Sequence, residues 1–134
     1  MDVKFYLCPT CGNIVYKVED SGVVPECCGS KMILMEPKST DNGTEKHLPA
    51  VEWLDDCTLR VRIGSLPHPC TQEHFIQMIA IRLKDGIIIK RLCKSACSDY
   101  PQAVFHCRKD EVTGVYSYCN LHGLWHLALD PEIR

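Results

Sequence analysis

The chain has 134 residues, of which 46% are hydrophobic and 24% are charged, and its formal net charge is −2. These proportions are typical of a folded globular protein and exclude an intrinsically disordered one. The near-neutral charge gives no reason to expect nucleic-acid binding. The sequence has no run of about 18 apolar residues, so we expect no membrane-spanning segment.

Cysteine is the outlying residue type, with ten copies. Such a number predicts either disulfide bonds in a secreted protein or metal ligands in a reducing compartment. The segment from Met1 to Cys8 has an acid at position 2 and no apolar stretch of signal-peptide length. We therefore expect a cytoplasmic protein whose thiols stay reduced and partly bind metal.

The N-terminal segment carries two short cysteine pairs. They are Cys8-Pro9-Thr10-Cys11 and Cys27-Cys28. Four thiolates in a tetrahedron suit Zn²⁺ or iron, and the glycine after each pair allows a tight turn whose N–H groups can point at the sulfurs. Two disulfides or four unrelated thiols are the alternatives, but the expected compartment favours a metal. The adjacent second pair is unusual for a zinc ribbon and favours iron.

A polar, turn-rich stretch at residues 37–44 predicts a linker between two domains, 1–37 and 38–134. The first holds four cysteines, and a module of fewer than about 40 residues seldom folds without a metal, disulfides or a partner. The second holds all six histidines of the chain. A structural metal is therefore expected in the first domain on size alone.

The second domain has the pattern of an all-β protein. Residues 58–63 alternate polar and apolar side chains, as a half-buried strand does. Residues 75–83 and 87–89 are rich in β-formers and flank Asp85-Gly86, a strong hairpin signal. Further short strands are expected at residues 103–105 and 115–118. Short strands between Gly, Pro and Asp turns predict a sandwich or barrel without a long amphipathic helix.

Three short motifs of the second domain contain histidine. They are Glu45-Lys46-His47, His68-Pro69-Cys70-Thr71-Gln72-Glu73-His74 and Cys119-Asn120-Leu121-His122. Imidazole suits Fe, Zn and Cu, and thiolate adds a soft ligand. A lone histidine is usually an ordinary polar residue, but this concentration predicts a metal site. A closed tetrahedral zinc site has four ligands, and these motifs offer five candidates. They are His47, His68, His74, Cys119 and His122.

The order and spacing of these motifs resemble superoxide reductase of the two-iron desulfoferrodoxin type over nearly the whole chain. The resemblance is carried by Cys8-x2-Cys11 with Cys27-Cys28, Glu45-Lys46-His47, His68-Pro69, Glu73-His74 and Cys119-Asn120-x-His122-Gly123-Leu124-Trp125.

The resemblance implies a fold, two metal centres and a reaction. The first domain would be a desulforedoxin-like module, similar to rubredoxin, with iron, or zinc as the alternative, on Cys8, Cys11, Cys27 and Cys28. The second would be an immunoglobulin-like β-sandwich. Its iron would have His47, His68, His74 and His122 as equatorial ligands and Cys119 as the axial ligand. Superoxide would be reduced to hydrogen peroxide at this iron by a homodimer, with electrons from a rubredoxin-like donor.

Two residues beside His47 acquire roles through the resemblance. Lys46 would steer the superoxide anion, since a local positive charge raises association rates. Glu45 resembles the residue that occupies the sixth position of resting ferric iron and would help peroxide leave. We also expect the backbone N–H groups of Leu121 and His122 to donate to the Cys119 sulfur.

Several features remain outside this scheme. For Trp125 and Tyr118 we prefer core packing over a role in excluding water from the site. Five cysteines are left over, and free thiols are a better interpretation than a third metal site. They are Cys57, Cys70, Cys93, Cys97 and Cys107. The competing functions are a metal-stabilised binding module, an electron carrier and a superoxide dismutase.

Overall fold

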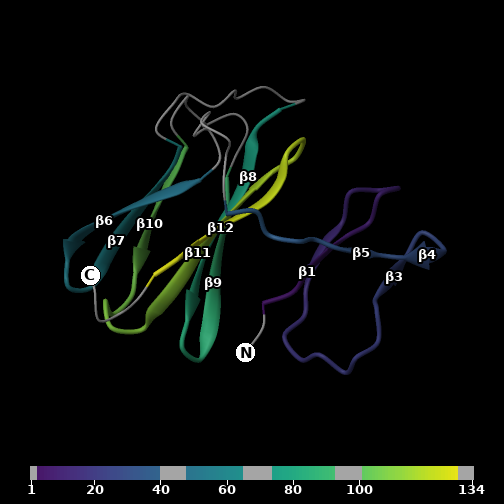
Figure 1. The fold of residues 1–134 in the computed structure, drawn as a ribbon, viewed down its shortest axis with the longest axis horizontal. Helices are drawn as coiled ribbons and strands as arrows, with labels where there is room; N and C mark the ends of the chain where they lie inside the picture. Colours follow the sequence, from purple (N-terminus) through teal and green to yellow (C-terminus); the bar gives the residue numbers. More distant parts are fainter. Residues whose placement is uncertain (1–2, 40–47, 65–73, 93–100, 130–134) are drawn as a thin grey trace. The chain divides into compact units, whose positions relative to one another are not determined.

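A computed structural model describes residues 3–39, 48–64, 74–92 and 101–129 of the chain. The chain divides into two compact units, Met1–Glu36 and Pro37–Arg134, and the described residues of both form β-strands (Figure 1). These ranges contain no helix that is long and apolar enough to cross a membrane.

The first unit is built from short antiparallel strands. They are β1 (Phe5–Leu7), β2 (Ile14–Tyr16), β3 (Glu26–Cys27), β4 (Ser30–Lys31) and β5 (Ile33–Leu34). One sheet has the order β2-β1-β5, and β3 pairs with β4 in a hairpin. The core of this unit is a small cluster of Tyr6, Cys8 and Met32, against which Val24 and Cys27 pack. Because this small cluster buries little apolar surface, it stabilises the fold only weakly. We therefore expect a bound metal to contribute to the stability of this unit.

The second unit is a β-sandwich of antiparallel strands. They are β6 (Pro49–Asp55), β7 (Thr58–Ile63), β8 (Ile76–Leu83), β9 (Gly86–Arg91), β10 (Gln102–His106), β11 (Val112–Cys119) and β12 (Gly123–Ala128). In the described part of the chain one sheet has the order β10-β7-β6 and a second the order β12-β11-β8-β9. The all-β class and the sandwich expected from the sequence are therefore confirmed.

The sandwich core follows from the period-two pattern of its strands. On β7, Leu59, Val61 and Ile63 are fully buried, while Arg60 and Arg62 between them lie outside the core cluster. The opposite sheet contributes buried side chains mainly from β8 and β11. This alternation fixes which side of each strand enters the core, because a slip of one residue would turn every apolar side chain to solvent.

Two turns of the sandwich correspond to features of the sequence. Leu83 pairs with Gly86, so Lys84-Asp85 is the turn between β8 and β9, as the Asp-Gly signal predicted. Cys119 pairs with Gly123, so the turn from β11 to β12 contains the Cys-x2-His motif. Strand β8 pairs with β11, and Ile76 lies opposite Cys119 in this pairing. The start of β8 and the end of β11 therefore lie at the same edge of the sheet.

Candidate metal centres

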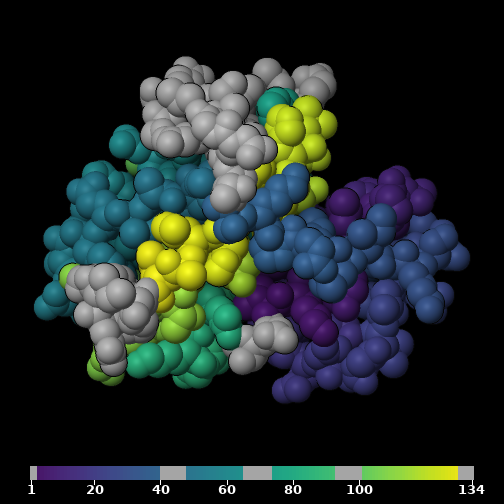
Figure 2. Space-filling view, viewed as in Figure 1, coloured from purple at the N-terminus to yellow at the C-terminus, as the bar shows by residue number. Residues whose placement is uncertain are grey.

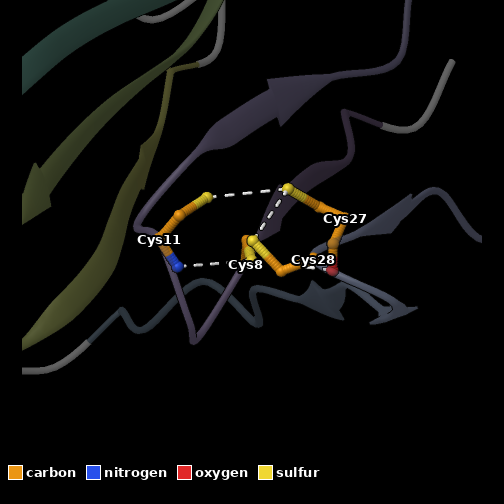
Figure 3. A group of neighbouring side chains, drawn as sticks. All are labelled: Cys8, Cys11, Cys27 and Cys28. Atoms are coloured by element: carbon orange, nitrogen blue, oxygen red, sulfur yellow. Dashed lines mark hydrogen bonds between the residues drawn. The ribbon is translucent and has the colours of Figure 1, made fainter.

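The four N-terminal cysteines form one cluster (Figure 3). Cys8 follows β1, Cys27 ends β3, and Cys11 and Cys28 lie in the turns beyond them. All four sulfur atoms lie within 4.8 Å of one another. The Cys11 and Cys27 sulfurs are 3.6 Å apart, and those of Cys27 and Cys28 are 4.0 Å apart. Sulfur atoms converging in this way are a ligand set for iron or zinc.

The backbone around the first pair is a closed turn. The Gly12 N–H donates to the Cys8 carbonyl at 2.9 Å, and Gly12 has φ of 82°. The N–H of Cys11 points at the Cys8 sulfur, with 3.5 Å between N and Sγ. The side-chain amide of Asn13 points at the Cys27 sulfur, at 3.6 Å. Donors aimed at two of the sulfurs stabilise negative charge on them.

The second pair includes an unusual backbone conformation. Cys28 has φ of 53° and is the one non-glycine residue with positive φ among those described. Gly29 follows with φ of 76°. A left-handed residue other than glycine is uncommon and costs on the order of 1 kcal/mol. This conformation turns the chain so that two adjacent cysteines both face the cluster, and the sequence pattern did not predict it.

The protonation of the cluster also points to a cation. The Cys11 N–H, more than any other group, lowers the pKa of Cys8 to about 6, against the opposing effect of burial. A hydrogen bond with the Cys11 side chain is the largest cause of a raised pKa at Cys27. It is also the largest cause at Cys28, whose pKa rises to about 12. Crowded sulfurs resist carrying negative charge together, so four thiolates need a bound cation.

A second cluster lies at the edge of the sandwich where β8 begins and β11 ends. The ligand atoms of His74, Cys119 and His122 all lie within 4.8 Å of one another. His74 Nε2 is 3.1 Å from His122 Nδ1, and Cys119 Sγ is 3.6 Å from the same Nδ1. Cys119 is fully buried, whereas His122 is exposed. The thiol is thus held inside, and the imidazole of His122 faces solvent.

One hydrogen-bonded pair joins the two segments of this second cluster. The Phe75 N–H donates to Asn120 Oδ1 at 2.9 Å, and the Asn120 N–H donates to the Phe75 carbonyl at 3.3 Å. Phe75 follows His74 directly, and Asn120 follows Cys119. These contacts bridge 45 positions of sequence and hold His74 beside the turn that carries His122.

The predicted site residues divide into those the structure brings together and those it does not describe. Cys8, Cys11, Cys27 and Cys28 converge, as do His74, Cys119 and His122. His47, His68, Glu45, Lys46, Cys70, Cys93 and Cys97 lie outside the described residues. The N–H groups of Leu121 and His122 as donors to the Cys119 sulfur stay a prediction. Tyr118 and Trp125 are buried, as core packing requires.

Of the leftover cysteines, Cys57 is exposed and Cys107 half-buried. They lie across from each other beyond the last pair of β7 and β10, with the Cys107 N–H donating to the Cys57 carbonyl at 3.0 Å. Neither belongs to a cluster of three or more metal-ligating side chains among the described residues.

Together, the fold and the clusters define a class of small all-β metalloprotein with a four-cysteine centre in one unit and a His/Cys centre in a sandwich. Residues 39–128 match the family model of desulfoferrodoxin, and the chain belongs to the desulfoferrodoxin family. The resemblance found in the motifs is thereby confirmed. The two clusters are consistent with the two iron sites of desulfoferrodoxin.

Individual relatives agree with this membership over most of the chain. A desulfoferrodoxin homolog of Archaeoglobus fulgidus is 39% identical, covering 92% of this chain and 94% of its own. The desulfoferrodoxin of Nitratidesulfovibrio vulgaris is 37% identical, covering 91% and 93%. The crystal structure of the superoxide reductase from Treponema pallidum has a TM-score of 0.78 at 26% identity, covering 94% of this chain and 98% of that one. These relatives place the chain among oxidoreductases.

Proposed function

We propose that this chain reduces superoxide to hydrogen peroxide at an iron centre in its second domain. The balanced reaction takes one superoxide, one electron and two protons to one peroxide. The observation that supports it best is the convergence of His74, Cys119 and His122 at one edge of the sandwich in a desulfoferrodoxin-family chain. We propose His47 and His68 as the remaining ligands, with the chain divided into domains at residues 37 and 38.

The described donors fit iron. Imidazole and thiolate together are ligands for a redox-active transition metal, and three of the five proposed ligands lie within 4.8 Å of one another. A ferrous iron held by these residues would supply the electron that superoxide receives. A second iron, or zinc, would be held by Cys8, Cys11, Cys27 and Cys28, whose sulfurs form a comparable cluster.

Four residues at or near the second centre have proposed roles in the reaction. Full burial shields the Cys119 sulfur from water, and this sulfur would donate electron density to a bound iron. The exposed edge at His122 admits a small anion. Lys46 would attract that anion electrostatically, and Glu45 would assist release of peroxide. A rubredoxin-like protein would return the electron, and we propose a cytoplasmic homodimer.

The stoichiometry of oxygen tests the proposal. Pre-reduced, iron-loaded protein should consume superoxide without releasing O₂, forming one ferric centre per superoxide. Release of half an O₂ per superoxide would make the protein a dismutase. No consumption would leave an electron carrier or a metal-stabilised binding module.

Cysteine variants separate the two centres. Cys119→Ser should abolish superoxide consumption, while Cys8→Ser should alter only the spectrum of the four-cysteine centre. Cys57→Ser is the matched control, because Cys57 is an exposed cysteine outside both clusters. An active Cys119→Ser protein would contradict the proposed ligand set.

A further inference from the structure

Lys38 pairs directly with the strand that follows the His/Cys turn. Its N–H donates to the Leu124 carbonyl at 2.9 Å, and its own carbonyl accepts from the His126 N–H at 2.8 Å. These bonds make a parallel bridge between Lys38 and Trp125 on β12. In Figure 2 the blue segment around residue 38 lies at the surface against the yellow β12. The backbone of Lys38 is therefore fixed at this position whatever its side chain does.

The side chain of Lys38 extends from this anchor to the turn itself. Its Nζ donates to the carbonyl of His122 at 2.7 Å and lies 5.1 Å from the centre of the Trp125 ring. A Cβ built on Gly123 would lie 3.7 Å from Nζ, which is an ordinary van der Waals contact. Gly123 also has φ of 89°, a conformation that favours glycine. The ammonium is thus held by a carbonyl and an aromatic ring beside Gly123.

The carbonyl that Lys38 holds belongs to a residue of the metal centre. The ring of His122 is 3.6 Å from the Cys119 sulfur and 3.1 Å from His74 Nε2. We propose that Lys38 is a positioning residue of the His/Cys centre, which fixes the His122 turn and places a positive charge beside it. This inference rests on the proposed function, because it concerns how that centre is tuned.

Two consequences follow from the charge. A cation near a metal stabilises the less positively charged oxidation state, so Lys38 should raise the midpoint potential of the centre and favour the ferrous form. The same charge attracts an anion approaching the exposed edge, an effect that salt screens. No step of the reaction needs Lys38 to gain or lose a proton.

The test compares three variants of the full-length, iron-loaded protein. Lys38→Met removes the charge and the donor but keeps an unbranched side chain over Trp125. Lys38→Arg keeps both charge and donor. Lys109→Met is the matched control, since the Lys109 Nζ also lies over a tryptophan, 5.9 Å from the Trp53 ring centre. Lys109 precedes the start of β11, and an eight-residue strand spans roughly 23 Å, so Lys109 is remote from Cys119.

The readouts are the midpoint potential, the thiolate-to-iron absorption band and the rate of reaction with superoxide at several salt concentrations. Lys38→Met should lower the potential, shift the band and slow the reaction by about two- to fivefold with a flatter salt dependence. Lys38→Arg should restore all three, and Lys109→Met should change none. An unchanged potential and band in Lys38→Met, or equal changes in Lys109→Met, would overturn the proposal.

Failure of this inference is distinguishable from failure of the proposed function. The potential and the absorption band are measured without superoxide, so they report on Lys38 even if the wild-type protein proves to be an electron carrier. Conversely, a wild-type protein that reduces superoxide with a Lys38→Met variant identical in all readouts would leave the function intact and remove Lys38 from it.

Discussion

Replacing Asn120 by alanine should weaken iron binding at the His/Cys centre without disturbing the four-cysteine centre. The substitution removes the Oδ1 that accepts the Phe75 N–H at 2.9 Å. Phe75 is 4% exposed, so water replaces that acceptor poorly, and the loss is worth about 1–3 kcal/mol. If this energy is what holds His74 beside His122, iron affinity falls by about 5- to 150-fold.

Competition between the protein and a ferrous chelator measures this affinity, with the absorption band of each centre followed separately. Asn120→Asp is the first control, because it retains an oxygen acceptor and should keep most of the affinity. Asn13→Ala is the second, because the Asn13 amide points at the Cys27 sulfur at 3.6 Å. It should perturb the four-cysteine spectrum and leave the His/Cys spectrum unchanged.

An Asn120→Ala protein that bound iron at the second centre as tightly as the wild type would refute this role of Asn120. Equal weakening of iron binding in Asn120→Asp and Asn120→Ala would also refute it, because the oxygen acceptor would then not be the relevant feature. A fall in both centres together would indicate general unfolding, which circular dichroism of the variant would reveal.

Two further predictions concern stability. Gly114→Ala would place a Cβ 2.8 Å from His126 Nε2. It should therefore lower the free energy of unfolding of the sandwich, measured with denaturant, by about 1–3 kcal/mol. His126→Ala should relieve most of that loss in the double variant, and additive effects of the two substitutions would contradict the contact. In the first unit, hydrogen bonds from Lys17 and, to a smaller extent, Lys4 lower the pKa of the Asp20 carboxyl group. The ionised carboxylate therefore stabilises the fold at pH values above the unfolded carboxyl pKa of about 3.9. This stabilisation is lost as the pH falls through the lower pKa of the folded state. The stability difference between wild type and Asp20→Asn should therefore be constant from about pH 5 to 8 and shrink below about pH 4; a difference that grew on acidification would be inconsistent with this sign.

The sequence by itself determined the features that depend on neighbours along the chain. The alternation at residues 58–63 predicted a strand with one buried face, and Asp85-Gly86 predicted the β8–β9 turn. The cysteine pairs of the first unit were recognisable because the members of each pair are at most three residues apart. Their spacing alone brings two sulfurs to one point, and a small module leaves few ways to place the other two.

Only the tertiary structure decided how distant residues meet at the second centre. His74 reaches Cys119 because β8 pairs with β11 in one register, and that register is set by burial of both strands in the sandwich core. The role of Asn120, and the reach of Lys38 from a polar linker to the His122 carbonyl, depend on the same arrangement. No local pattern encodes such contacts, because their energy comes from hydrogen bonds between segments that only the folded sheet brings together.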